Sequence, residues 1–286
     1  TRIKILSDLK IDETRVPQDG RFGTTIDDKK IDFRVSTLPT RHGEKAVLRI
    51  LDPSAGLIEL PALGLAGRNL KLAEEYIQKP YGSILITGPT GSGKTTTLYS
   101  ILRKINDEAV NIITLEDPIE ILLPGINQSQ IQEEIGYTFA SGLRSILRQD
   151  PDIIMVGEIR DSDTANLATH ASLTGHLVFS TLHTNDTIGV IPRLIDLGVE
   201  KYLIAPTLNL AMAQRLLRKL CSACKVKSKP STAEENILKE EIGRMPEEVR
   251  NGLDKNFPVY KASQEGCTEC RGKAFKGRLA IFEVLE

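Results

Sequence analysis

The chain has 286 residues, of which 40% are hydrophobic and 26% are charged, a balance that suits one large or two moderate globular domains. Its 37 basic and 38 acidic residues leave a net charge of −1, which excludes an overall polycation that binds nucleic acid by counterion release. No apolar run reaches the roughly 20 residues that a membrane-spanning helix needs, and no secretory signal precedes the fold.

The first 52 residues predict a small, mainly antiparallel sheet that opens with a helix before Lys10. Short runs in which apolar and polar residues alternate favour strands at Lys30–Val35 and Ala46–Leu51. Turn-forming residues separate these strands at Pro17–Gly20 and Pro39–Gly43. This pattern is typical of a small α+β domain.

A change in composition then separates two parts of the chain. Asp52–Gly56 reads as a linker, so we predict domains at residues 1–56 and 57–286. A helix is predicted at Arg68–Gln78. From Ser83 onward, apolar strands alternate with helical stretches, which predicts a parallel α/β sheet.

The strongest motif is GPTGSGKT at Gly88–Thr95, which follows the predicted strand Ser83–Thr87 and opens a helix at Lys94–Leu98. Glycines let backbone N–H groups converge on phosphate oxygens, and the helix N-terminus favours negative charge. Lys94 would bridge the β- and γ-phosphates of ATP, and Thr95 would bind Mg²⁺. The predicted phosphate-binding residues are Gly88, Pro89, Thr90, Gly91, Ser92, Gly93, Lys94, Thr95 and Thr96.

Three further apolar strands each end at a residue with acid–base or metal-binding chemistry. The strands and the residues after them are Asn111–Leu115 with Glu116, Ile153–Val156 with Glu158, and Leu177–Leu182 with His183. The carboxyl ends of parallel strands meet at one edge, so we expect these side chains to face the phosphate loop. One carboxylate would then organise the shell of Mg²⁺ and another would polarise the water, and His183 would sense the γ-phosphate. The alternatives are helix caps or surface charges for the carboxylates and a structural role for the histidine.

The transition state of phosphoryl transfer also needs positive charge, from Lys94 alone or from arginines of a neighbouring subunit. The candidates flank the Glu158 strand or lie in the small domain: Arg144, Arg148, Arg160, Arg15, Arg21, Arg34 and Arg41. Exposed arginines more commonly solvate a surface, so from the residues alone these positions stay candidates.

All four cysteines occur in two pairs with the spacing CxxC, at Cys221 and Cys224 and at Cys267 and Cys270. This pattern predicts a tetrathiolate zinc site with a structural role, because four thiolates leave no open position for a substrate. The alternative is two redox-active pairs or four plain thiols. Residues 231–256 between the pairs are charged and amphipathic, and we expect them to be helical.

Several segments together resemble the secretion ATPase superfamily, and specifically the type II secretion and type IV pilus assembly ATPases (the GspE/PilB group). These segments are GPTGSGKTTTLY at 88–99, TLEDPIE at 114–120, LRSILRQDPDIIMVGEIRDSDTA at 143–165, TGHLVFSTLHTND at 174–186, RVPQDGR at 15–21 and STLPTRHGE at 36–44. The resemblance implies an N2-like, PAS-like small domain followed by a RecA-like domain with a zinc-bound tetracysteine subdomain at about 219–275. It also implies a cytoplasmic homohexamer at the bacterial inner membrane that hydrolyses ATP to drive pilin or pseudopilin assembly and protein secretion.

The resemblance also implies roles for single residues. Lys94 and Thr95 match the Walker A motif, Glu116 matches the catalytic glutamate of the acidic box, and Glu158 matches an atypical Walker B glutamate. The histidine box corresponds to His176 and His183, and the small-domain arginines that reach the phosphates correspond to Arg21, Arg34 and Arg41. The implied cofactors are ATP, Mg²⁺ and Zn²⁺, and the implied partners are platform proteins of the inner membrane.

Two departures from the family pattern stand out. After the last cysteine pair the family has CxxCxxTGYxGRxGI, whereas this chain has KAFKGRLAI at 273–281 and lacks two of the glycines. The family's N-terminal docking domain is missing, and both ends read as folded sequence, so we expect a fragment of a longer protein that is recruited poorly to the membrane. Retraction motors and type IV secretion ATPases resemble the same core but usually lack the tetracysteine insertion.

Three alternative functions stay open at this point. A retraction-type pilus ATPase shares the core motifs. A nucleic-acid motor needs a basic or aromatic lining, but aromatic residues make up only 5% of the chain and tryptophan is absent, so we expect no nucleic-acid partner. The candidate basic patch for such a motor is Arg215, Arg218, Lys219, Lys225, Lys227 and Lys229. A zinc-stabilised nucleotide kinase is the third alternative, although two carboxylates suit water activation better than transfer to a second nucleotide.

Overall fold

The computed structural model describes residues 1–26, 29–51, 58–245, 247–251 and 259–286. Contacts within the chain define two compact units, Thr1–Arg215 with Ala280–Glu286, and Leu216–Leu279. The predicted linker Asp52–Gly56 lies outside the described residues. The predicted boundaries at residues 56, 219 and 275 stay predictions.

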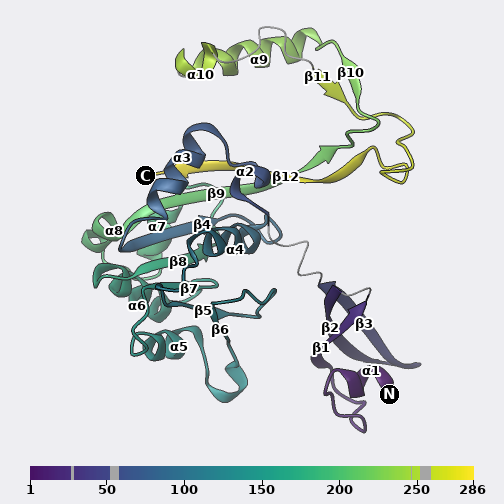
Figure 1. The fold of residues 1–286 in the computed structure, drawn as a ribbon, viewed down its shortest axis with the longest axis vertical. Coiled ribbons are helices and arrows are strands. Elements are labelled where there is room, and N and C mark those ends of the chain that lie inside the picture. Colours follow the sequence, from purple (N-terminus) through teal and green to yellow (C-terminus); the bar gives the residue numbers. More distant parts are fainter. Residues whose placement is uncertain (27–28, 52–57, 246, 252–258) are drawn as a thin grey trace. The chain divides into compact units, whose positions relative to one another are not determined.

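The first part of the chain forms a three-stranded antiparallel sheet in the order β1-β2-β3, as the sequence predicts (Figure 1). Its elements are α1 (Arg2–Leu6), β1 (Gln18–Ile26), β2 (Lys29–Thr40) and β3 (Gly43–Leu51). Helix α1 contributes Lys4, which is 4% exposed and satisfied by Glu44 Oε1 at 2.6 Å and by the backbone oxygen of Glu13 at 2.7 Å. A buried lysine is tolerated because both its charge and its donors are paired.

The turn predicted at Pro39–Gly43 contains the observed turn at Arg41 and His42, whereas the turn predicted at Pro17–Gly20 was wrong. Gln18, Asp19 and Gly20 belong to β1, and a side chain at Gly20 would collide with the backbone oxygen of Ser7. Glycine therefore marks a close approach of backbone to the strand here and not a turn. Pro39 also lies in β2. The pairing of β2 with β1 ends at Thr37, so the N–H that proline lacks removes no hydrogen bond between these two strands.

A seven-stranded sheet in the order β12-β9-β4-β8-β7-β5-β6 forms the main part of the larger unit (Figure 1). Strands β9, β4, β8, β7, β5 and β6 pair in parallel, as predicted. The strands are β4 (Gly82–Thr87), β5 (Ile112–Glu116), β6 (Asn127–Gln130), β7 (Ile153–Val156), β8 (Leu177–Leu182), β9 (Leu208–Leu220) and β12 (Phe275–Leu285). The four strands predicted from apolar runs are confirmed to within one residue.

Helices cover both faces of this sheet, which is why its strands are apolar without alternation. They are α2 (Leu60–Leu63), α3 (Gly67–Tyr76), α4 (Lys94–Ile105), α5 (Phe139–Ile146), α6 (Ser162–Leu173), α7 (Val190–Asp196) and α8 (Lys201–Thr207). In one core cluster, α2, α3 and α4 pack with Ile84 and Ile86 of β4. In the other, the four helices α5, α6, α7 and α8 pack with Leu85. Successive residues of β4 thus enter opposite cores. The helix predicted at Arg68–Gln78 is confirmed as α3.

The smaller unit contains β10 (Val226–Ser228) and β11 (Val259–Lys261), which pair antiparallel, and two helices, α9 (Thr232–Arg244) and α10 (Glu247–Asn251). Ser231 and Glu234 form a capping box that fixes the start of α9. These helices fall within the predicted helical segment 231–256, whose residues 252–256 lie outside the described part of the chain. Among the described residues, no helix is long and apolar enough to cross a membrane.

Candidate nucleotide site and cysteine cluster

The phosphate loop connects the end of β4 to the start of α4 at the carboxyl edge of the sheet. Its glycines adopt conformations that other residues avoid, with φ of 144° at Gly88, 77° at Gly91 and 92° at Gly93. A Cβ at Gly88 would lie 2.5 Å from the backbone oxygen of Gln214. The loop therefore needs glycine both for its turn and for its contact with β9.

Lys94 begins α4 and lies across the loop. Its Nζ donates to the backbone oxygens of Gly88 at 2.8 Å and Pro89 at 3.3 Å. Burial lowers the pKa of Lys94, and the negative charge of Glu158 opposes this shift. The ammonium group thus lies within electrostatic reach of the carboxylate at the end of β7.

Two hydroxyl groups of the loop suit a phosphate and its metal ion. Ser92 is 3% exposed, and its Oγ has no hydrogen-bond partner among the described residues. A buried hydroxyl without a partner is costly unless a ligand satisfies it. Thr95 is exposed at the first turn of α4, where a threonine oxygen can bind Mg²⁺.

Glu158 lies just beyond β7 and contacts two basic side chains. Arg160 donates to Glu158 Oε1, and His183 Nε2 lies 3.4 Å from Glu158 Oε2. Burial alone would raise the pKa of Glu158, but its hydrogen bonds and charge interactions with Arg160 and His183 outweigh this and hold the pKa below its usual value. Because its pKa is low, the carboxylate of Glu158 is ionised. The side chain is 18% exposed, so the carboxylate is within reach of solvent.

Glu116, at the end of β5, has a different environment. The residue is 3% exposed, and its carboxylate accepts hydrogen bonds from the Tyr99 hydroxyl, from Thr114 Oγ1 at 2.7 Å and from Gln128 Nε2 at 2.9 Å. Its neighbour Asp117 faces Arg160 at 3.8 Å. The two carboxylates predicted to share the work therefore differ: Glu116 is buried and held by three donors, whereas Glu158 is accessible to solvent.

The structure does not bring every predicted residue to this edge. His176 precedes β8, and its backbone oxygen accepts from Gly82 N at the start of β4, so it lies at the edge opposite the phosphate loop. Arg21 and Arg34 face each other in the pairing of β1 and β2, and Arg41 lies in the turn between β2 and β3. These three arginines belong to the small sheet.

Sequence reasoning missed the residues that support the site. Tyr99 and Gln128 hold Glu116, while Gln214 accepts a 2.8 Å hydrogen bond from Thr97 on the first turns of α4. Gln214 is 1% exposed and lies 117 residues from Thr97 in the chain, so no local pattern identifies the pair. Tyr99 is five positions after Lys94 on the buried side of α4, which is the one signal in the sequence.

The four cysteines form a compact cluster. Their sulfur atoms all lie within 4.8 Å of one another, with Sγ–Sγ distances of 3.7 Å for Cys221–Cys267 and 3.8 Å for Cys224–Cys270. Four thiolates at the vertices of a tetrahedron around Zn²⁺, each about 2.3 Å from the metal, lie about 3.8 Å apart. The cysteines are free and not joined in disulfides, so their geometry fits zinc.

Backbone donors prepare this cluster for a metal. Amides of Cys267 and Ala274 donate to Cys270 Sγ at 3.1 and 3.2 Å. Burial raises the pKa of Cys270, but these donors outweigh it and lower the pKa to about 6. The thiolate form of Cys270 is thereby favoured.

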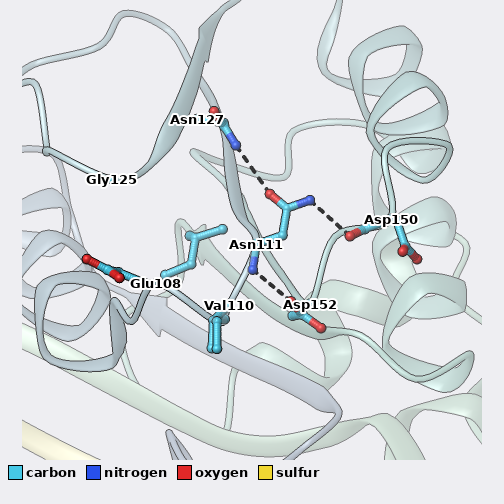
Figure 2. A pocket seen from close by; sticks show the side chains of 9 residues that line it. Glu108, Val110, Asn111, Gly125, Asn127, Asp150 and Asp152 are labelled. Carbon is cyan, nitrogen blue, oxygen red and sulfur yellow. Dashed lines mark hydrogen bonds between the residues drawn. The ribbon is translucent and has the colours of Figure 1, made fainter.

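The opposite edge of the sheet carries a polar cavity of about 530 Å³ (Figure 2). Asn111 connects three of its lining residues: its backbone N donates to Asp152 Oδ2 at 2.7 Å, and its side chain joins Asn127 to the backbone of Asp150. This network fastens the starts of β5, β6 and β7. We interpret this network as structural, because its hydrogen bonds join the loops and strand ends at this edge.

A family model described as Type II/IV secretion system protein matches residues 1–286. The chain is 48% identical over 285 residues to the Type II secretion system protein E of Pseudomonas aeruginosa, covering 100% of this chain and 54% of the relative. It is also 48% identical over 286 residues to the Type IV pilus assembly ATPase PilB of Myxococcus xanthus, covering 100% of this chain and 49% of the relative.

Solved structures agree with this relationship. The pilus retraction motor PilT with bound ADP matches with a TM-score of 0.62 and 35% identity, over 79% of this chain and 67% of that chain. The Legionella pneumophila ATPase DotB matches with a TM-score of 0.57 and 26% identity, over 82% of this chain and 68% of that chain.

The chain spans about half the length of the curated relatives it matches. Within that span, the resemblance read from the motifs is confirmed by a match over every residue. The chain belongs to the type II/IV secretion system protein family.

Proposed function

We propose that this chain is the core of an ATP-hydrolysing motor that drives pilin or pseudopilin assembly and protein secretion. The observation that carries the proposal is the edge of the sheet where Lys94 lies within electrostatic reach of Glu158, which in turn contacts His183. A phosphate held by the loop would meet a cation, an ionised carboxylate and an imidazole at that edge. These groups suit transfer of the γ-phosphoryl group to water, giving ADP and phosphate.

Each residue has a defined part in this proposal. Backbone amides of the loop and Lys94 bind the phosphates, and Thr95 and Glu158 hold Mg²⁺, which neutralises charge on the phosphates when bound. Glu116 orients the attacking water and His183 senses the γ-phosphate. Glu116 is the more protected carboxylate, so in this role its contact with water is confined to a single position.

Arg21, Arg34 and Arg41 are proposed to stabilise the transferred phosphoryl group from the small sheet of a neighbouring subunit. Arg21 and Arg34 are supported by their pairing across β1 and β2, whereas Arg41, in the turn after β2, is supported by the motif resemblance alone. This role requires an assembly, and the proposed assembly is a homohexamer.

The tetracysteine unit is proposed to bind Zn²⁺ through Cys221, Cys224, Cys267 and Cys270. Support comes from sulfur separations that match a tetrahedral site and from amide donors that favour thiolate. The site would be structural, since all four positions around the metal are taken by protein ligands.

The biological setting is proposed from the relatives. Matches along the whole chain are named a type II secretion protein and a type IV pilus assembly ATPase, which supports a motor on the cytoplasmic side of the inner membrane that acts with platform proteins. The retraction alternative is favoured less, because the retraction motor PilT is 35% identical and matches 79% of the chain. No observation favours a nucleic-acid motor or a nucleotide kinase.

Phosphate release from ATP by the purified chain tests the proposal. We expect Mg²⁺-dependent release of phosphate that Lys94→Ala reduces by at least about 100-fold, because the lysine contacts the phosphates in the transition state. Lys104→Ala, at the exposed end of the same helix, is the matched control and should retain wild-type activity. Stimulation by single-stranded DNA, or transfer of phosphate to a nucleotide acceptor, would instead support one of the two rejected alternatives.

A further inference from the structure

The hydrogen bonds that the buried carboxylate of Glu116 accepts determine which of its oxygens can bind a water molecule. An ionised carboxylate has about four acceptor positions, two on each oxygen. Oε1 accepts from Thr114 and Gln128, which fills both of its positions, while Oε2 accepts from Tyr99. Among the described residues no further side chain donates to this carboxylate. A water that Glu116 orients therefore binds to Oε2, beside the Tyr99 hydroxyl.

Tyr99 is itself held firmly. Its side chain is 1% exposed within the core that joins α4 to the sheet, and its oxygen accepts from the backbone N of Glu120 at 3.1 Å. Burial and the negative charge of Glu116 raise the pKa of Tyr99 well above its usual value. A raised pKa keeps the hydroxyl protonated at neutral pH, so that it donates to Glu116.

The tyrosine also links two parts of the candidate site. It belongs to α4 (Lys94–Ile105), whose first residue lies across the phosphate loop, while Glu116 ends β5. One hydrogen bond thus joins the helix that binds phosphate to the carboxylate that orients water. A shift of α4 when phosphate binds would be transmitted directly to Oε2.

We propose that Tyr99 is a positioning residue that fixes the Oε2 atom of Glu116 relative to the phosphate-binding helix, so that this oxygen orients the attacking water. The inference rests on the proposed catalytic role of Glu116. Tyr99 does not touch the nucleotide, and it acts through the orientation of the carboxylate. Positioning of this kind affects the rate of the chemical step more than substrate binding.

The test is Tyr99→Phe, which keeps the ring and removes the hydroxyl. We expect kcat for ATP hydrolysis to fall about tenfold while KM stays within about twofold, because the lost hydrogen bond affects the transition state and not the bound ground state. The matched control is Tyr137→Phe, which removes a hydroxyl bonded to Ser129 Oγ at 2.7 Å and should leave kcat unchanged. Thermal unfolding of both variants measures the structural cost of each hydroxyl.

A double-mutant cycle with Glu116→Gln separates positioning from a merely structural effect. If Tyr99 acts through Glu116, adding Tyr99→Phe to Glu116→Gln lowers kcat no further. The proposal is overturned if Tyr99→Phe has wild-type kcat, if it raises kcat, or if it lowers kcat equally in the Glu116→Gln background. Lys94→Ala is measured in parallel, because its loss of activity upholds ATP hydrolysis by this chain even if the role of Tyr99 is rejected.

A second variant serves if Tyr99→Phe does not fold. Thr114→Val is isosteric and removes one donor from Oε1, the other oxygen of the same carboxylate. We expect a smaller fall in kcat, about threefold, that again disappears in the Glu116→Gln background. A fall that persists in that background would contradict the proposal.

Discussion

The parallel sheet and the tetracysteine unit are stabilised in different ways. The sheet is enclosed by two apolar clusters on its opposite faces. Among the described residues 216–279, by contrast, only Cys221, Cys270 and Ala274 are buried. Hydrophobic burial accounts for the sheet, whereas the smaller unit has almost no core and depends on the proposed metal. The nucleotide site should therefore survive changes that unfold the cysteine unit.

Of the changes that affect one region and not the other, removal of the metal should have the largest effect. A structural zinc site contributes about 10–16 kcal/mol of apparent binding free energy at neutral pH, which is then lost from the folding of the smaller unit. We expect Cys221→Ser or a strong chelator to abolish zinc binding and to expose residues 216–279 to limited proteolysis. Binding of a fluorescent ATP analogue should change by less than about twofold, since the phosphate loop belongs to the other compact unit, which has its own core.

The matched control for the cysteine is Ser222→Ala, an exposed position between Cys221 and Cys224. This variant should keep full zinc content and the wild-type proteolysis pattern. Undiminished zinc in Cys221→Ser would refute the metal site. Loss of nucleotide binding on chelation would show that the two regions do not fold independently.

The reverse change weakens the sheet and leaves the metal in place. Ile154 is fully buried in β7, and truncation to alanine should cost about 2–5 kcal/mol because it removes apolar contacts and leaves a cavity. Urea unfolding followed by circular dichroism measures the loss, and zinc content should stay at wild type. Ile237→Ala on α9, 61% exposed, should cost less than about 0.5 kcal/mol. Equal losses of unfolding free energy in the two variants would contradict the proposed difference between the sheet and the cysteine unit.

The smallest effect concerns the loop after the last cysteine. Ala274 has φ of 58°, is buried, and accepts from Cys221 N at 3.0 Å. A left-handed conformation costs alanine about 1–2 kcal/mol, whereas glycine adopts it freely but loses more entropy on folding. We expect Ala274→Gly to stabilise the smaller unit by about 0.5–1 kcal/mol, measured as stronger retention of zinc against a chelator.

Gly277 lies in β12 just after this loop, with φ of 81° and no neighbour in the way of a Cβ, and it is the opposite test. Gly277→Ala should weaken zinc retention by a similar amount, about 1 kcal/mol. An increase in retention on Gly277→Ala, or a decrease on Ala274→Gly, would show that backbone strain does not govern this loop.

Local patterns predicted the sheet well because buried strands have an unmistakable composition. Ile153–Val156 and Leu177–Leu182 were identified with their correct ends, and the residues that follow them meet at one edge. The first strand was missed because Gly20 looks like a turn residue, while its real function is to admit the backbone of Ser7. A pattern within a strand cannot reveal what packs across it.

The support of the site was beyond prediction for the same reason. The bond from Gln128 to Glu116 and the bond from Thr97 to Gln214 join residues from different elements, so only the folded sheet brings them together. The resemblance to a family suggested His176 for the site, but the chain direction of β8 places it at the other edge. The roles of Arg21, Arg34 and Arg41 stay predictions, because they require a second subunit.

Glu158→Gln tests the central claim, that the edge of the sheet beside the phosphate loop hydrolyses ATP. The substitution keeps the size of the side chain and removes its charge, so ATP binding measured with a fluorescent analogue should persist. Phosphate release should fall by about 10²-fold or more, because the charge that organises the metal shell is lost. Wild-type turnover by Glu158→Gln would contradict the account.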